Sequence, residues 1–164
     1  KRQVIENSQI GDNCDINSHT VVDGALVQEG CSLGPFARIR PGSELAKGVK
    51  VGNFVETKKI RMGENSKASH LAYLGDAIIG DDVNIGAGTV TCNYDGVEKH
   101  RTNIGDGAFV GTNSTLVAPL DLGEDSFVAA GSTVTKEVGL GQLAIGRGKQ
   151  RNIDGWFRPG SKSD

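Results

Sequence analysis

Arg40 and Lys58 are the two residues whose types and spacing point most directly to chemistry. They lie 18 residues apart in a segment, residues 36–61, that holds seven Lys and Arg against two Glu. If the chain coils with about 18 residues per turn, the two side chains stack on one face about 4.8 Å apart. Like charges this close repel, and an anion between them removes the repulsion. The pair therefore predicts a phosphate clamp, for which the Arg fork is well suited. The alternative is a pair of solvated surface charges.

The chain has three histidines, at positions 19, 70 and 100. His70 comes two residues after Ala68, which we place inside the fold, so its side chain should face outward beside the two cations. An imidazole titrates near neutral pH and is a natural base for removing a proton from an amine during acyl transfer. His19 is interpreted as a surface residue, and the role of His100 is left open. A three-histidine zinc site is improbable because His19 and His70 lie about three coils apart.

The element that must position these residues is a six-residue repeat. An aliphatic residue recurs every six positions, and a mostly small residue stands four positions after it. This pattern is typical of a short strand followed by a tight turn with positive φ, and three such units close a triangular coil of about 18 residues. Coils stacked through parallel strands form an all-β parallel β-helix of roughly nine coils. An antiparallel sandwich is disfavoured because its strands alternate with period two. The longest run is Ile104, Val110, Leu116, Leu122, Val128 and Val134.

Interruptions of the repeat divide the chain. Residues 1–138 are predicted to form the β-helix domain, with residues 92–103 projecting as a loop because they lack inward aliphatic positions. Residues 139–164 are predicted to form a basic C-terminal tail. Neither the loop nor the tail has a core of its own, so both are expected to dock on a neighbouring copy. Tyr94, Thr112 and Ala130 form a second column in steps of 18, in which the register is intact only from Thr112 to Ala130. This column is a candidate groove for a thin, flexible ligand, the alternative being that small residues are simply common at corners.

Composition narrows the class of protein. The 164 residues include 24 Gly, which argues against long helices. The charge balance, 18 Lys and Arg against 20 Asp and Glu, argues against a general nucleic-acid binder. No apolar run approaches the roughly 20 residues that cross a bilayer. The three cysteines match no zinc or disulfide spacing, and we therefore expect a cytoplasmic protein. From the charge balance and the short apolar runs, we expect neither a nucleic-acid nor a membrane partner.

Four sequence blocks carry a resemblance over nearly the whole chain. The chain resembles the C-terminal acetyltransferase domains of the bacterial bifunctional enzymes that combine glucosamine-1-phosphate N-acetyltransferase and N-acetylglucosamine-1-phosphate uridyltransferase. The resemblance implies a left-handed β-helix of hexapeptide repeats. It also implies transfer of the acetyl group of acetyl-CoA to glucosamine-1-phosphate, for UDP-N-acetylglucosamine and cell-envelope synthesis. We expect this chain to lack the uridyltransferase half of those enzymes. The blocks are Gly34–Gly42, Val51–Lys59, His70–Asp76 and Asn84–Gly96.

The resemblance also implies roles for single residues. His70 matches the catalytic base, and no metal is needed for the acetyl transfer. From the charge and position of Glu56, we hypothesise that it orients the amine or His70. A homotrimer with active sites shared between subunits is implied. The matched substrate-binding residues are Arg40, Lys58, Tyr73, Asn84 and Lys99. The matched acetyl-CoA residues are Ala87, Asn93, Tyr94, Thr112, Ala130 and Arg147.

Two other functions remain open at this stage. One is a different hexapeptide acyltransferase, acting on serine, a sugar nucleotide or an antibiotic. The predicted phosphate clamp favours a phosphorylated acceptor instead. The other is a non-enzymatic structural or ice-binding β-helix. That function needs a flat face with regular ranks of Thr, whereas the outward positions here are irregular and charged.

Overall fold

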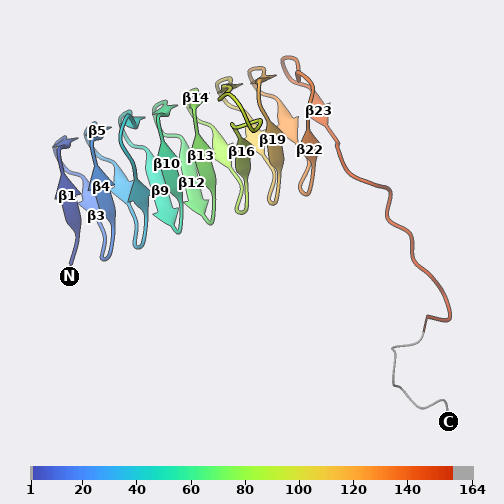
Figure 1. The fold of residues 1–164 in the computed structure, drawn as a ribbon, viewed down its shortest axis with the longest axis horizontal. Helices are drawn as coiled ribbons and strands as arrows, with labels where there is room; N and C mark the ends of the chain where they lie inside the picture. The colour runs from blue at the N-terminus through green and yellow to red at the C-terminus, as the bar shows by residue number, and fades with distance from the viewer. Residues whose placement is uncertain (1, 157–164) are drawn as a thin grey trace, which may run out of the picture.

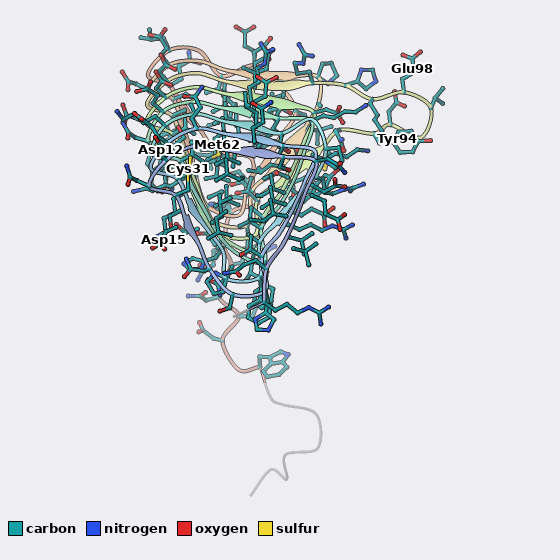
Figure 2. All side chains as sticks on the ribbon, turned by 90° about the vertical axis from the view of Figure 1, so that its left-hand side faces the viewer. Asp12, Asp15, Cys31, Met62, Tyr94 and Glu98 are labelled. Carbon is teal, nitrogen blue, oxygen red and sulfur yellow. The ribbon has the colours of Figure 1, made fainter. Side chains whose placement is uncertain are left out.

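The structure, a computed structural model, describes residues 2–156. Over this range the chain forms short β-strands and no α-helix. The strands make three parallel sheets, which we name A, B and C, and each coil contributes strands to the sheets in turn. The coils stack along one axis as a left-handed parallel β-helix (Figure 1), and the prediction of the fold is confirmed. Viewed along that axis, the prism is triangular (Figure 2).

The strands are only two to four residues long. Sheet A contains β1 (Val4–Glu6), β4 (Val21–Asp23), β7 (Arg38–Ile39), β10 (Glu56–Lys58), β13 (Tyr73–Gly75), β16 (Val90–Cys92), β19 (Thr115–Val117) and β22 (Thr133–Val134). Sheet B contains β2 (Gln9–Ile10), β5 (Leu26–Val27), β8 (Glu44–Leu45), β11 (Arg61–Met62), β14 (Ala77–Ile79), β17 (Thr102–Ile104) and β20 (Leu120–Leu122). Sheet C contains β3 (Asp15–Ile16), β6 (Ser32–Leu33), β9 (Lys50–Asn53), β12 (Lys67–His70), β15 (Asn84–Ile85), β18 (Phe109–Val110), β21 (Phe127–Val128) and β23 (Leu143–Ala144).

Successive coils differ in length, and the numbers of the paired residues give the size of each step. Val4 pairs with Val21, a step of 17, and Arg38 pairs with Glu56, a step of 18. The longest step is 25, from Val90 to its partner Thr115. Relative to a step of 18, the seven extra residues (25 − 18) leave the prism between β16 and β17 as the projecting loop (Figure 2). This loop and the residues after Gly146 lie outside the coils, so the prism has about eight coils where nine were expected.

The interior of the prism is filled by the repeat's aliphatic positions. All of those expected to point inward from Val22 to Val134 are buried, and so are small residues four positions later, such as Ala37 and Ala108. Val4 differs, with 38% of its surface exposed, because the step of 17 pairs it with Val21 and puts Ile5 opposite the buried Val22. The buried residues form one continuous core that runs the length of the prism. Outward residues are thereby fixed in columns along the axis.

The β-helix continues beyond the predicted boundary at residue 138. β23 pairs with β21, and the carbonyl of Gly146 accepts a hydrogen bond from Thr133 N at 2.9 Å. The boundary prediction was wrong because the last step, from Phe127 to Leu143, is only 16 and breaks the six-residue period. Residues 147–156 then run away from the prism (Figure 1), and residues 157–164 of the predicted tail lie outside the described range. In residues 2–156 no helix has the length and apolar character needed to span a membrane.

Candidate active site

Three cations gather where the strands of sheet A end and the chain turns toward sheet B. Arg40 follows β7 and Lys58 ends β10, and the register of these strands makes the two residues neighbours on consecutive coils. Lys99 belongs to the projecting loop and lies beside Lys58. The ammonium of Lys99 beside it lowers the pKa of Lys58, and desolvation and the charge of Arg40 add to this effect. The predicted stacking of the clamp residues is confirmed, and Lys99 completes a cation cluster of Arg40, Lys58 and Lys99.

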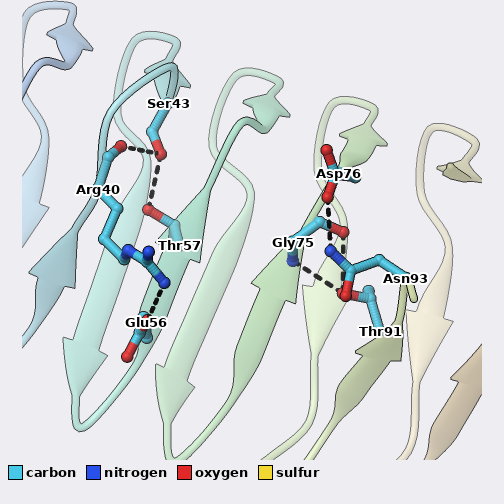
Figure 3. Close-up of polar contacts among 8 residues, drawn as sticks. All are labelled: Arg40, Ser43, Glu56, Thr57, Gly75, Asp76, Thr91 and Asn93. Carbon is cyan, nitrogen blue, oxygen red and sulfur yellow. Dashed lines mark hydrogen bonds and ion pairs between the residues drawn. The ribbon is translucent and has the colours of Figure 1, made fainter. Parts of the chain in front are cut away.

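Polar contacts hold Arg40 in place (Figure 3). The hydroxyl of Ser43 donates to the backbone carbonyl of Arg40 at 2.8 Å and lies 3.0 Å from Thr57 Oγ1. Arg40 Nη1 donates to Glu56 Oε1 at 2.8 Å, and each of these two side chains is about one-third exposed. Glu56 was expected to orient the amine or His70. Its observed partner is instead Arg40, which it can hold ready for an anion.

Tyr73 covers the outer face of sheet A beside the cation cluster. A Cβ atom added to Gly75 would lie 2.6 Å from Tyr73 Oη and 2.9 Å from Asn93 Nδ2, so a larger residue would displace the ends of these side chains. Asn93 is buried, and its Nδ2 donates to Asp76 Oδ2 at 2.5 Å (Figure 3). Gly75 and Asp76 received no role from the sequence. Their position at the end of the sequence block His70–Asp76 was the signal that could have found them.

His70 lies at the other end of the sheet A strands, where the chain passes from sheet C to sheet A. It ends β12 and its side chain is exposed. The registers of β12, β15, β18 and β21 align His70 with Ala87, Thr112 and Ala130, one residue on each of the next three coils. Arg147 Nη1 reaches this line and donates to the carbonyl of Ala130 at 2.6 Å. We call this line the corner column: His70, Ala87, Thr112 and Ala130.

The corner column changes one prediction from the sequence. Thr112 and Ala130 are neighbours as expected, but Tyr94 does not belong to their column. The residue below Thr112 is Ala87, because the coil step there is 25 and not 18. Tyr94 lies in the projecting loop, where its hydroxyl donates to the carbonyl of Gly96 at 2.6 Å. The seven-residue insertion therefore removes Tyr94 from the prism.

Asn84 is not brought to the cation cluster within this chain. It starts β15 on sheet C, opposite Lys67, whereas His70 is at the far end of β12. The other predicted substrate residues, Arg40, Lys58, Tyr73 and Lys99, lie on or beside the outer face of sheet A. A site that uses Asn84 together with them must therefore draw on a second sheet C.

Contrary to the prediction from the sequence, His70 does not lie directly beside the cation cluster. Gly75 is opposite Lys58 and is five residues after His70. At about 3.3 Å per residue this is roughly 16 Å along the chain, which long Arg and Lys side chains can shorten. A small molecule lying over Tyr73 can therefore present an anionic group to the cations and a second group to His70. The corner column offers a strip of small side chains that starts at His70 and ends near Arg147.

The sequence of this chain is similar to known proteins over nearly its full length. It is 56% identical over 156 residues to the "Bifunctional protein GlmU" of Marinobacter nauticus, a match that covers 95% of this chain and 34% of that protein. It is 54% identical over 159 residues to the protein of the same name from Cellvibrio japonicus, covering 97% of this chain and 35% of that protein. The chain is a relative of the GlmU proteins and matches their C-terminal part. It spans about a third of the length of these curated GlmU relatives.

The fold has further support beside the GlmU relatives. Residues 77–98 and 101–136 match the family described as "Hexapeptide repeat of succinyl-transferase". One similar solved structure is a single-residue mutant of perosamine N-acetyltransferase from Caulobacter crescentus in complex with CoA and GDP-perosamine, with a TM-score of 0.63, 22% identity and coverage of 71% of this chain and 53% of that one. Another is the acetyltransferase domain of PglB from Neisseria gonorrhoeae FA1090 in complex with acetyl coenzyme A, with a TM-score of 0.65, 17% identity and coverage of 71% and 55%. At these identities the two structures show a shared fold.

Proposed function

We propose that this chain transfers the acetyl group of acetyl-CoA to the amine of glucosamine-1-phosphate. The observation that carries the proposal is the arrangement around sheet A. The cation cluster lies at one end of its strands and His70 at the other, with Tyr73 between them. Glucosamine-1-phosphate has its phosphate and its amine on adjacent carbons and therefore close together, so the long side chains of the cation cluster must extend over Tyr73 toward His70 for one molecule to meet both. The named GlmU relatives support the same substrate.

The roles of the residues follow from this orientation. Arg40, Lys58 and Lys99 bind the phosphate, and Tyr73 contacts the sugar ring. His70 takes a proton from the sugar ammonium or from its attacking amine. The free amine then attacks the thioester carbonyl directly, forming the C–N bond and a tetrahedral oxyanion. The oxyanion collapses with cleavage of the C–S bond, the nitrogen loses its extra proton, and the leaving thiolate of coenzyme A is protonated. We assign the stabilisation of the oxyanion to the backbone N–H of Ala87, the coil neighbour of His70, because the N–H groups of Gly86 and Gly88 donate to backbone carbonyls.

The corner column fits the elongated shape of acetyl-CoA. Three small side chains, Ala87, Thr112 and Ala130, follow His70 on successive coils, and Arg147 is hydrogen-bonded to the last of them. The column spans three steps, roughly 14 Å at about 4.8 Å per step. A thioester placed at His70 would therefore send the pantetheine arm along the column and its phosphates toward Arg147. Solved neighbours of this fold that hold CoA or acetyl coenzyme A support the same co-substrate.

A homotrimer with shared sites would complete this arrangement. Three exposed apolar residues lie at the sheet C–sheet A corner on consecutive coils, and all three have positive φ, which bulky side chains rarely adopt: Phe36, Phe54 and Leu71. The rings of Phe36 and Phe54 stack with their centroids 5.4 Å apart. We call these residues the corner ridge and place it on a threefold axis. Sheet A of one copy would then face sheet C of the next, and Asn84 of that copy would meet the cation cluster.

Exchange of ridge residues tests the trimer. The double variant Phe36→Ser, Phe54→Ser is expected to dissociate at concentrations where the unchanged chain is a trimer of three times 17.2 kDa. Each buried phenyl ring contributes about 1.5–3 kcal/mol, and every trimer would lose six of them. Light scattering gives the mass, and an activity assay on the same samples shows whether the monomer is inactive.

The matched control is Leu26→Ser, which removes a side chain of similar exposure from the outer face of sheet B. This variant should remain a trimer. A fully active monomer of the unchanged chain, or a trimeric double variant, would contradict the shared-site arrangement.

We place the reaction in the cytoplasm, where acetyl-CoA is available and where the three free cysteines would stay reduced. Its product would feed UDP-N-acetylglucosamine synthesis and hence the cell envelope. No step of the proposed transfer needs a metal ion, and no nucleic acid or membrane is assigned as a partner.

Acceptor comparison by mass spectrometry is the direct test of the proposed function. The chain is incubated with acetyl-CoA and with glucosamine-1-phosphate, glucosamine, serine or an amino-sugar nucleotide. We expect N-acetylation of glucosamine-1-phosphate, and much slower reaction of glucosamine because it lacks the phosphate. A faster reaction with serine or with the sugar nucleotide would replace this proposal by another acyltransferase of the same fold.

A further inference from the structure

The projecting loop between β16 and β17 is closed by one carboxylate. Asp95 Oδ1 accepts hydrogen bonds from the backbone N–H groups of Val97 and Glu98, at 2.8 and 2.7 Å. Asp95 Oδ2 lies 2.6 Å from His100 Nε2. The backbone of Asp95 also donates to the carbonyl of Glu98 at 3.2 Å. A single side chain therefore ties both strands of the loop together.

These contacts surround Lys99 on both sides. Glu98 and His100, the residues before and after it, are both held by Asp95. Lys99 itself pairs with Tyr94 in an antiparallel bridge, and His100 N donates to the carbonyl of Asn93 at 2.8 Å. The position of Lys99 is thus set by the loop's own hydrogen bonds.

The position that Lys99 takes is electrostatically unfavourable without an anion. Its side chain reaches Lys58, where each ammonium repels the other, and Arg40 adds a third positive charge. An unconstrained lysine on a loop would move away into solvent. The hydrogen bonds to Asp95 supply the constraint that keeps Lys99 at the cation cluster.

The carboxylate of Asp95 remains charged wherever the enzyme would work. Hydrogen bonds from the backbone of Glu98, from His100 and from the backbone of Val97 hold the pKa of Asp95 well below its usual range. The folded loop therefore keeps its closing contact at neutral pH.

We propose that Asp95 is a positioning residue for acetyl transfer, which holds the loop so that Lys99 completes the phosphate-binding cluster. This inference rests on the proposed function, because it takes Lys99 as a phosphate ligand. It assigns Asp95 no contact with either substrate. Its effect must therefore pass through Lys99, and this is the property to be tested.

A double-mutant cycle on the full chain separates this role from a general effect on the loop. The variants are Asp95→Ala, Lys99→Ala and the two combined, with Glu98→Ala as a control carboxylate in the same loop. Lys99→Ala and Asp95→Ala are each expected to raise the KM for glucosamine-1-phosphate by roughly tenfold or more. The combined variant should be no worse than Lys99→Ala alone, because the positioned group is already gone. Glu98→Ala should match the unchanged chain.

A spectroscopic measurement reports the position of Lys99 without catalysis. In an NMR titration of the lysines, the pKa of Lys58 should rise toward its ordinary value in Asp95→Ala, as it should in Lys99→Ala, because the neighbouring ammonium has left. A residue that merely supports the fold would lower the unfolding temperature and leave this pKa unchanged. We expect the unfolding temperature to stay close to that of the unchanged chain, since the loop lies outside the core.

The outcomes distinguish the positioning role from the function on which it rests. If Lys99→Ala raises the KM and Asp95→Ala does not, the positioning role is wrong while the phosphate cluster stands. The role is also wrong if the effects of the two substitutions multiply, as they would if Asp95 acted through a neighbouring copy or the coenzyme. If Lys99→Ala leaves the KM unchanged, Lys99 is not a phosphate ligand, and the positioning role falls with that assignment. Acetylation of glucosamine-1-phosphate by the unchanged chain tests the proposed function itself.

Discussion

Replacement of His70 by alanine is expected to lower kcat by about 10²–10⁴-fold, the usual contribution of general acid–base catalysis. The exposed imidazole ends β12 outside the core, so its loss should leave the β-helix intact. The KM for acetyl-CoA should change little, because Ala87, Thr112 and Ala130 remain in place. Steady-state kinetics with both substrates measures the effect.

His19→Ala is the matched control for this substitution. His19 is also exposed, and its ring stacks on Phe36 with centroids 4.7 Å apart, away from sheet A's cation cluster. Because this contact extends the corner ridge, light scattering must first show that the variant is still a trimer, and that trimer should retain the unchanged chain's kcat. Normal turnover by His70→Ala at neutral pH would rule out His70 as the base and leave proximity to the thioester as the remaining source of rate.

The sequence predicted the fold because its constraint is local and repeated. Each inward aliphatic residue must occupy the same place in its own coil, so a six-residue period fixes the corners without knowledge of distant contacts. Val110 and Val128 are opposite each other for this reason, as are Ile39 and Thr57. The stacking of Arg40 and Lys58 followed from the same register.

Features that depend on coil length could not be predicted in this way. Tyr94 was assigned to a column with Thr112 because a constant step of 18 was assumed, and the actual step of 25 puts Ala87 there instead. The last strand, β23, was missed because a step of 16 hides its period. When columns are predicted with a constant step of 18, an insertion of seven residues or a deletion of two assigns every later residue to the wrong column.

Side-chain partners were also beyond the sequence. Glu56 is two residues from Lys58, yet it pairs with Arg40 on the preceding coil. Asp76 contacts Asn93, which is distant in the chain and adjacent in space. Asp95 carried no signal beyond its place in a recognisable motif, although its carboxylate closes the loop. Such pairings are set by neighbouring coils whose relative steps differ.

Alanine at Arg40 or Lys58 is expected to weaken the binding of glucosamine-1-phosphate more than that of acetyl-CoA. Loss of one charge-assisted hydrogen bond costs about 1.5–3 kcal/mol. This corresponds to a roughly 10- to 150-fold rise in KM for the sugar phosphate. Arg40→Lys should also be harmful, because a lysine cannot make the bidentate contact of the guanidinium. Isothermal titration with glucosamine-1-phosphate and steady-state kinetics measure the change.

The pH dependence of this binding carries a second signature of the cluster. Lys99 lowers the pKa of Lys58, so the charge of Lys58 is lost at a lower pH than that of an ordinary lysine. Affinity for the phosphate should therefore fall as the pH rises through this lowered pKa, and Lys58→Ala should remove that alkaline limb. The matched control is Arg61→Ala, which breaks a similar Arg–Glu pair, with Glu44 at 2.9 Å, on sheet B. Normal binding of glucosamine-1-phosphate by both Arg40→Ala and Lys58→Ala, or an equal loss in Arg61→Ala, would show that the phosphate is bound elsewhere.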